Sequence, residues 1–349
     1  MPVLQHLVID QYGAYVGKHS ERLKITKEGV TLVEAPLLYL ETVTIANRGV
    51  SISAAAVHEC TERGIPIYFV SSDGSPYASL YSAGLTGTVA TRRAQLQAYA
   101  DGRGLYLALA FSSGKIQNQS NLLKYMAKYR KETDPMLYEE LRLRANEVLD
   151  DLIGMDKIRD YPEFLDGSAT PDGLRAEIMG LEGHAARRYW GAIKLTLPQQ
   201  YAFTGRVGRG AKDPINSALN YGYGILYGQV ERCLVLAGLD PYAGFLHVDR
   251  PGKPSLTLDF IEEFRQPVVD RTVIGMANKG AAFDQDERGL LTEKTRRTLA
   301  EKTFQHLDAS VPYEGKRHPL RAVMQMQARH LAAYLRIERS DYLSFNMSW

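Results

Sequence analysis

The residues best suited to chemistry lie in the second half of this 349-residue chain, and Glu182 is the first of them. It falls on a predicted helix over residues 172–195, about 100° around the axis from Leu181, at the shoulder of an apolar stripe. Residues 187–190, which follow, are two arginines and two aromatic residues; these can contact phosphates and bases but also occur on ordinary helix surfaces and in cores. Pattern alone favours a glutamate that reaches solvent with its stem packed.

A second group of polar residues lies between positions 247 and 263. His247 follows an apolar run, where a lone histidine is more often a hydrogen-bonded structural residue than a ligand. Asp259 and Glu262 are three apart on one predicted helix, so they can converge on one cation. This helix is apolar on several sides, and carboxylates on a largely buried helix need partners, of which a metal ion is one. Spacing leaves open whether Glu262 or Glu263 points the same way as Asp259.

A third feature is the predicted helix over residues 214–237, which begins with Asp-Pro and stops at Gly238. Its interior holds three tyrosines and three glycines, namely Tyr221, Tyr223, Tyr227, Gly222, Gly224 and Gly228. Each glycine costs roughly 1 kcal/mol relative to alanine, so a close approach of another backbone is expected. The helix could pack against the element that carries the active site, with its tyrosines directed at nucleic acid. The pattern slightly favours the alternative, a tightly packed core helix with buried tyrosines.

The elements that must position these residues fall into two regions. Up to about residue 82, short alternating or apolar runs separated by turn residues predict strands. The candidate strands are 7–9, 15–16, 23–25, 43–45, 65–70 and 79–81. Positions 28–29 and 73–74 are candidate turns, and a helix over 54–63 follows a Ser53 cap and ends at Gly64.

Past residues 83–92 the chain changes to long, charged, leucine- and alanine-rich stretches at helical spacing. Helices are predicted at about 91–99, 120–131, 137–152, 172–195, 214–237, 254–274, 292–307 and 320–339. The sequence therefore predicts an α+β protein. An N-terminal β domain over residues 1–85 precedes an all-α-helical domain over 86–349, which carries all the candidate residues.

Composition limits the classes of protein to consider. With 45% hydrophobic residues, 23% charged residues and a net charge of +2, the chain is typical of a globular protein and not of a disordered one. Cys60 and Cys233 are too few for a disulfide framework or a cysteine-ligated zinc site, and they favour a reducing cytoplasm. No basic region leads into a long apolar run, so neither secretion nor membrane insertion is expected.

Basic residues are grouped although the total charge is small. The groups are Arg142 and Arg144; Arg187 and Arg188; Arg206, Arg209 and Lys212; and Lys294, Arg296 and Arg297. Local basic patches of this kind are what phosphate contacts need. The glycine-rich segment 205–210 could hold backbone phosphates, or it could be a solvated loop. It follows no predicted strand, which argues against a dinucleotide-binding fingerprint.

Four ordered blocks of the chain resemble the signature blocks of the CRISPR-associated endonucleases that integrate spacers. These blocks span residues 181–190, 213–223, 238–247 and 256–265. The opening segments 7–13 and 64–67 are also similar to that family, so the resemblance covers nearly the whole chain. Four blocks in the same order are far more specific than any single motif. The resemblance implies the same two-domain fold, with a β domain followed by a helical catalytic domain.

The resemblance also implies a metal site and a reaction. Members hold a metal through one glutamate, one histidine and a third carboxylate, which fall here on Glu182, His247 and Glu262. Many members have aspartate at the third position, and Asp259 matches a further acidic position beside the site. Two carboxylates and an imidazole suit Mn²⁺ well and Mg²⁺ acceptably. The implied function is insertion of foreign DNA into the CRISPR array, with a DNA 3′-hydroxyl attacking a phosphodiester, or cutting when water attacks.

The implied partners are DNA, a second copy of the chain bound through the β domain, and the small second protein of CRISPR adaptation. The candidate DNA contacts are Arg187, Arg206, Arg209, Lys212, Tyr227 and Arg250. Two other classes stay open: a non-catalytic DNA-binding scaffold, and a small-molecule hydrolase, which no nucleophile motif supports. Loss of Glu182 from an acidic cluster is expected to relieve like-charge repulsion and leave the fold intact.

Overall fold

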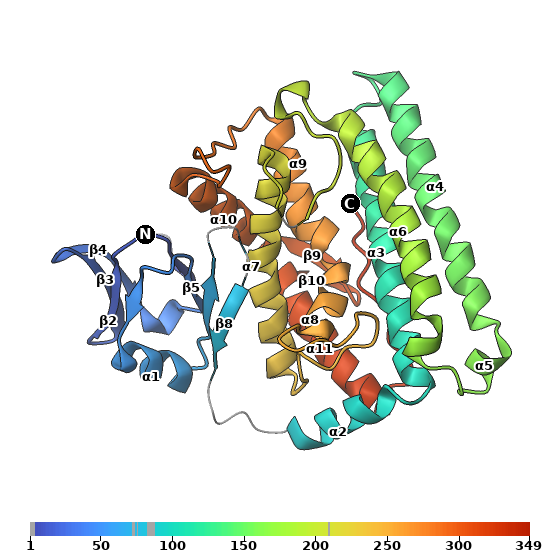
Figure 1. The fold of residues 1–349 in the computed structure, drawn as a ribbon, viewed down its shortest axis with the longest axis horizontal. Helices are drawn as coiled ribbons and strands as arrows, with labels where there is room; N and C mark the ends of the chain where they lie inside the picture. Colours follow the sequence, from blue (N-terminus) through green and yellow to red (C-terminus); the bar gives the residue numbers. More distant parts are fainter. Residues whose placement is uncertain (1–3, 72–73, 75, 82–87, 209) are drawn as a thin grey trace.

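The computed structural model describes residues 4–71, 74, 76–81, 88–208 and 210–349. A strand-rich lobe lies at one end of the molecule and a larger helical lobe forms the rest (Figure 1). The helix α2 (Thr88–Ala98) opens the helical lobe. The α+β fold class predicted from the sequence is confirmed, while the boundary predicted between residues 85 and 86 lies outside the described residues.

The strand-rich lobe consists of two four-stranded sheets and one helix. Their strand orders are β1-β5-β7-β8 and β4-β3-β2-β6. The strands are β1 (His6–Ile9), β2 (Tyr15–His19), β3 (Arg22–Lys27), β4 (Val30–Pro36), β5 (Thr42–Ile45), β6 (Ser51–Ile52), β7 (Ile67–Val70) and β8 (Pro76–Leu80). Helix α1 (Ala54–Glu62) starts at Ser53, whose hydroxyl accepts the amide of Ala56, and Gly64 follows it with φ +67°. Both features match the caps read from the sequence.

The helical lobe is organised around α7 (Pro214–Leu236), which lies against β8 of the first lobe (Figure 1). The other long helices are α3 (Gly102–Lys128), α4 (Pro135–Arg159), α6 (Pro171–Thr196), α10 (Glu293–Leu307) and α11 (Leu320–Leu335), with a short α5 (Pro162–Leu165). Helices α3, α4 and α6 run side by side and share one continuous hydrophobic core with α7. None of the helices in the described part of the chain is long and apolar enough to cross a membrane.

Several expectations for this lobe are wrong in detail. Helix α3 begins at Gly102 and not near residue 120, because its glycines are close-packing positions and not breakers. A Cβ on Gly104 would lie 2.5 Å from the Ala98 carbonyl oxygen, and one on Gly114 would lie 2.5 Å from Ser344 Cβ. Helix α4 also runs farther than expected, to Arg159. A hairpin of β9 (Ser310–Tyr313) and β10 (Lys316–Pro319) interrupts the helices, and the sequence reading missed it.

The single helix expected over residues 254–274 is a series of short turns. Helix α8 (Ser255–Phe260) passes into the 3-10 turn η3 (Ile261–Glu263), then the π-helical turn η4 (Arg265–Asp270), then α9 (Arg271–Asn278). Pro267 lies inside η4 and lacks an amide hydrogen, so a regular α-helical ladder cannot pass through this point.

Two glycines of α7 lie in close contact with other elements, as expected from the destabilising effect of glycine inside a helix. A Cβ on Gly222 would lie 2.6 Å from Val269 Cγ1, on the turn η4. A Cβ on Gly224 would lie 1.7 Å from the carbonyl oxygen of Gly74, at the start of the β8 hairpin. The expected close packing of this helix is confirmed, and the burial of Tyr221 and Tyr223 agrees with the interpretation of a tightly packed core helix. That its tyrosines are directed at nucleic acid stays a prediction.

Candidate catalytic site

Glu182, on α6, and Glu262, on η3, meet at one lysine of α3. The Nζ atom of Lys115 lies 2.5 Å from Oε1 of Glu182 and 2.8 Å from Oε2 of Glu262. The two carboxylate oxygens therefore lie no farther apart than the sum of these distances, although the residues come from three different elements. Ser112, one turn earlier on α3, also donates to Glu182 Oε2 at 3.3 Å.

Glu262 is almost fully enclosed, with 3% of its side chain exposed, and two cations neutralise it. Lys115 is bound to one carboxylate oxygen, and Nε of Arg265 lies 3.0 Å from the other. Burial raises the pKa of Glu262, but the positive charges of Arg265, Lys115 and His247 outweigh burial and lower the pKa to about 2. The side chain is thus an anion at all ordinary pH values.

Lys115 keeps its charge for the same reason. Burial lowers the pKa of Lys115, whereas Glu182 and Glu262 raise it, and the net shift is upward. The site is therefore a largely buried triad of two carboxylates and one ammonium group, joined by Arg265. Buried carboxylates in such a triad hold their positions mainly through their partners, because each isolated charge would be strongly disfavoured.

His247 is held beside this triad by Asp259. Oδ1 of Asp259 lies 2.7 Å from Nδ1 of the imidazole and 2.9 Å from the His247 amide nitrogen. The other oxygen accepts the amides of Phe245 and Leu246 at 2.7 and 2.9 Å. With Nδ1 engaged, Nε2 is the ring nitrogen left to bind a cation. Asp259 thus orients the histidine and its loop, and its own oxygens are used up by these four contacts.

Glu263 points the opposite way from Glu262. Its carboxylate accepts the hydroxyl of Tyr342 at 2.5 Å and the amide of Phe345 at 2.7 Å, and the side chain is fully buried. Burial raises the pKa of Glu263 to about 7, although these hydrogen bonds oppose the rise. Of the two neighbouring glutamates that spacing could not separate, the one on the same side as Glu182 is Glu262.

These residues offer the donor types that a divalent cation needs, but they are not arranged as a complete coordination site. No group of three or more His, Cys, Asp and Glu side chains in the described ranges is arranged around one point as metal ligands. The reason is that the ammonium of Lys115 lies between the two glutamates. Two carboxylates that already share one cation, with an oriented imidazole beside them, nonetheless match the chemistry of a Mn²⁺ or Mg²⁺ site. A divalent ion would compete with Lys115 for the same oxygens.

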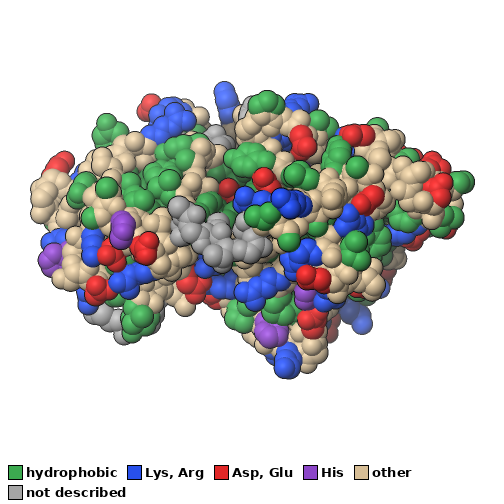
Figure 2. Space-filling view, turned by 90° about the horizontal axis from the view of Figure 1, so that it is seen from below, with side chains coloured by type: hydrophobic (Ala, Val, Ile, Leu, Met, Phe, Trp, Pro, Cys, Tyr) green, Lys and Arg blue, Asp and Glu red, His purple; other side chains and the backbone are tan. Residues whose placement is uncertain are grey.

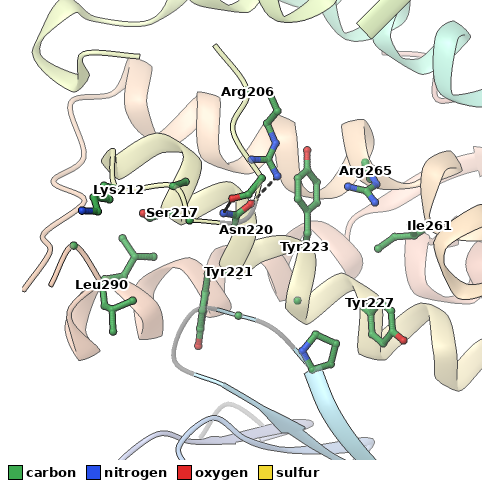
Figure 3. Close-up of a pocket in the computed structure, with 18 of the residues that line it drawn as sticks. Arg206, Lys212, Ser217, Asn220, Tyr221, Tyr223, Tyr227, Ile261, Arg265 and Leu290 are labelled. Atoms are coloured by element: carbon green, nitrogen blue, oxygen red, sulfur yellow. Dashed lines mark hydrogen bonds between the residues drawn. The ribbon is translucent and has the colours of Figure 1, made fainter. Parts of the chain in front are cut away.

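A cavity of about 500 Å³ opens beside the triad, between α7 and the first lobe. Arg206, Lys212, Arg265 and Tyr227 are among its lining residues. The ring of Tyr223 lies between two guanidinium groups, with Arg265 4.7 Å and Arg206 5.3 Å from its centroid (Figure 3). Arg206 is also held by Asn220 at 2.7 Å. Arg265 is the link between the two, because it lines the cavity and also pairs with Glu262, whereas Lys115, Glu182, Glu262 and His247 are not among the residues that line the cavity.

The other predicted DNA contacts lie away from this cavity or outside the described residues. Arg187 is exposed on α6 and Arg250 is exposed on the loop after His247, and neither lines the cavity. Arg209 lies outside the described residues. The face in Figure 2 shows lysine and arginine side chains mixed with acidic ones. The cavity is therefore more informative about phosphate contacts than the overall surface charge is.

Sequence reasoning missed Lys115 and Arg265. A signal for Lys115 was present, since it is the only charged residue between Arg103 and Lys124. A buried charge on an apolar helix needs a partner of opposite sign. Arg265 lay inside a matched block but carried no such signal, because its contacts depend on the turns η3 and η4.

Nearly the whole chain shares its two-lobed fold with solved structures of a casposase and of Cas1 proteins. A casposase bound to its integration product aligns with a TM-score of 0.80 at 23% identity, covering 97% of this chain and 92% of that one. A Cas1 protein from Thermotoga maritima aligns with a TM-score of 0.76 at 19% identity, covering 98% and 100%. At such identities these likenesses establish the fold.

Sequence comparison establishes the family. The model of the family described as CRISPR associated protein Cas1 matches residues 7–305. The CRISPR-associated endonuclease Cas1 1 of Archaeoglobus fulgidus is 35% identical, over 98% of this chain and 99% of the relative. A Cas1 1 endonuclease of Pyrobaculum aerophilum is 36% identical, over 85% and 89%. The chain belongs to the Cas1 family.

Proposed function

We propose that this Cas1 protein is a divalent-metal-dependent DNA endonuclease and integrase that inserts foreign DNA into a CRISPR array. The observation that carries the proposal is the convergence of Glu182 and Glu262 on one cation, with His247 oriented beside them. Its curated relatives are named endonucleases, and a structural neighbour is a casposase with its integration product. The family and the donor set therefore support the same chemistry.

We assign Glu182, His247 and Glu262 as the residues that hold Mn²⁺ or Mg²⁺. When bound, such an ion polarises the scissile phosphate and favours an ionised attacking oxygen. Lys115 pairs with both carboxylates, Arg265 pairs with Glu262, and Asp259 fixes the imidazole. The attacking oxygen forms a new P–O bond while the bond to the leaving oxygen breaks. A DNA 3′-hydroxyl as attacker gives strand joining, and water gives cutting.

We propose that DNA reaches this site through the adjoining cavity. Arg206, Lys212 and Arg265 line it and offer charge-assisted hydrogen bonds to phosphate oxygens, while Tyr227 offers a ring for a base. The two arginines stacked on Tyr223 are held in place before DNA arrives. The affinity for DNA is then expected to fall steeply as the salt concentration rises, as it does when several DNA phosphates contact basic side chains.

The partners we propose are a second copy of this chain and the small second protein of CRISPR adaptation. A solved Cas6-RT-Cas1–Cas2 complex has a chain that aligns with a TM-score of 0.73 at 21% identity, covering 98% of this chain and 36% of that one. The first lobe offers several exposed apolar residues to a partner, among them Val30 and Leu38. The integration complex would contain the helical lobe as its catalytic part.

The experiment that tests this function compares wild type with Glu182→Ala and His247→Ala. DNA cutting and joining are measured with the second adaptation protein present, with Mn²⁺, Mg²⁺ or a chelator. Turnover is expected only with metal and only in wild type, because each variant lacks one of three ligands. DNA affinity at fixed salt is expected to stay nearly constant, since phosphate contacts are spread over many basic residues.

The alternative, a non-catalytic DNA-binding scaffold, makes a different prediction for the same experiment. It requires tight DNA binding without metal-dependent turnover in wild type. It also requires that the two variants lose cooperative folding and DNA binding together. Retained turnover in both variants would show that Glu182 and His247 are not catalytic.

A further inference from the structure

The last ten residues of the chain return to the back of the candidate catalytic site. This C-terminal segment, residues 340–349, has no regular secondary structure, yet Tyr342, Phe345 and Met347 are buried. It runs along α3, where Asn118 donates to the Phe345 carbonyl at 2.8 Å and accepts the Met347 amide at 2.8 Å. A side chain at Gly114, next to Lys115, would collide with this segment at Ser344.

Glu263 joins the C-terminal segment to the turn η3. Its carboxylate accepts the Tyr342 hydroxyl, the Phe345 amide and Nε2 of Gln327, at 2.5, 2.7 and 3.1 Å. Asn118 also donates to the Glu263 carbonyl at 2.9 Å. Asn118 is thus bonded both to the turn and to the segment.

The two adjacent glutamates of η3 therefore point in opposite directions. Glu262 turns toward Lys115 and the site, and Glu263 turns toward the C-terminal segment. Helix α3 contacts both regions in the same way. Its Lys115 pairs with Glu262 in the site, and its Asn118, three residues later, bonds to the C-terminal segment. A 3-10 turn followed by a π-helical turn lacks a regular α-helical ladder to fix its side chains.

We propose that the C-terminal segment, acting through Glu263, is a positioning element that fixes Glu262 for cation binding and catalysis. The inference rests on the proposed function, because it concerns the same site. Glu263 and Tyr342 are positioning residues and touch neither cation nor DNA. Partners behind a ligand typically change metal affinity or activity by about 10- to 100-fold when they are removed.

Two variants test the link, each with a matched control from a surface pair of the same kind. Tyr342→Phe removes only the hydroxyl bonded to Glu263, and Glu263→Ala removes the whole connection. The controls are Tyr161→Phe and Glu177→Ala, because the Tyr161 hydroxyl donates to Glu177 at 2.9 Å and this exposed pair makes no hydrogen bond to Lys115, Glu182 or Glu262. All are made in the full chain. The readouts are the thermal midpoint, the Mn²⁺ dissociation constant without DNA, and kcat and KM for DNA joining.

A positioning role predicts a specific pattern. Tyr342→Phe is expected to raise the Mn²⁺ dissociation constant and lower kcat by about 10-fold while KM for DNA stays unchanged, with a larger effect for Glu263→Ala. The controls are expected to match wild type. By reciprocity, Mn²⁺ should slow hydrogen exchange at the amides of Phe345 and Met347 in wild type, since these amides bond to Glu263 and Asn118.

Other outcomes decide against it. If Tyr342→Phe and Glu263→Ala lower only the thermal midpoint, with Mn²⁺ affinity and kcat equal to wild type, the segment is a structural brace and the inference is wrong. If Glu263→Ala does not fold, Tyr342→Phe alone decides. A wild type that binds no Mn²⁺ would overturn the proposed function and this inference with it. Wild-type binding that both variants reproduce overturns the inference alone.

Discussion

Lys115 changes the electrostatics that the sequence suggested for the site. An acidic cluster without its own cation would repel itself, and losing Glu182 would then relieve the repulsion. The structure contradicts this expectation, because Lys115 binds both Glu182 and Glu262. Removing Glu182 takes away one of the two partners of a buried ammonium. Some loss of stability is therefore expected in Glu182→Ala, without global unfolding, since Glu262 still pairs with Lys115.

Lys115→Met should make the metal-free protein less stable and more responsive to Mn²⁺. Without the ammonium, two glutamates face each other inside the protein, which is expected to cost about 3 kcal/mol. A divalent cation would then bind without displacing a bound charge. We expect a lower thermal midpoint without metal and a larger upward shift of the midpoint with Mn²⁺ than in wild type. Thermal unfolding with a chelator and with Mn²⁺ measures both.

The control is Lys128→Met, an exposed lysine at the end of the same helix, which should behave as wild type. An Mn²⁺-induced shift in Lys115→Met no larger than the wild-type shift would mean that the cation does not bind where Lys115 now is. It would also count against Glu182 and Glu262 as shared ligands.

Asp259 and Glu262 should differ in how much the reaction depends on them. Glu262→Gln removes a proposed ligand and is expected to abolish turnover. Asp259→Asn keeps one acceptor oxygen but turns an amide group toward backbone donors, which should cost about 1–3 kcal/mol and loosen His247. Turnover is expected to fall by about 10- to 100-fold and remain measurable. Cleavage rates and thermal midpoints of the two single variants check this.

The same two variants also test the assignment of the turn. Normal turnover in Glu262→Gln, together with complete loss in Asp259→Asn, would exchange the roles of the two residues. The structure makes that outcome unexpected, because all four contacts of Asp259 are to the loop over residues 245–247.

At the scale of elements, the close contact between α7 and the turn η4 tolerates little change. Gly222→Ala would place a Cβ 2.6 Å from Val269, on the turn that follows Glu262. Such overpacking is expected to lower stability by about 1–3 kcal/mol and to reduce turnover as well. Gly191→Ala on α6 is the control, because nothing lies within 4 Å of its Cβ position.

The control should be more stable than wild type by up to about 1 kcal/mol, as expected for glycine to alanine in an open helix position. Denaturant unfolding and DNA turnover of both variants provide the measurement. If Gly222→Ala were as stable and as active as wild type, α7 would not constrain the turn.

Elements were predictable where local patterns decide them and not where distant contacts do. The caps of α1 and α7 were read correctly, because Ser53 and Asp213 bond amides only three residues away. The start of α3 was misread, because its glycines are explained only by Ala98 and Ser344. In the site, Glu182, His247 and Glu262 came from the family resemblance. Lys115 pairs with a residue 67 positions away, and no local pattern shows such a pairing.

At the scale of the whole molecule, the strand-rich lobe has a surface that the fold leaves uncovered. Strand β4 is an edge strand whose first five residues are all exposed. Val30 on this strand and Leu38 just after it are 63% and 77% exposed. An exposed apolar edge strand is a template for pairing with another chain. This lobe is therefore the surface that we expect to form the homodimer.

The double variant Val30→Glu with Leu38→Glu should convert a dimer into a monomer, because it places two like charges per chain in an apolar contact. The fold of each chain should survive, since both side chains are already exposed. Light scattering after size-exclusion chromatography, at one fixed protein concentration, measures the mass. Leu165→Glu is the control, because Leu165 is 73% exposed on α5 of the helical lobe and should leave the dimer intact. A dimer that survives the double variant but dissociates in Leu165→Glu would place the contact on the helical lobe instead.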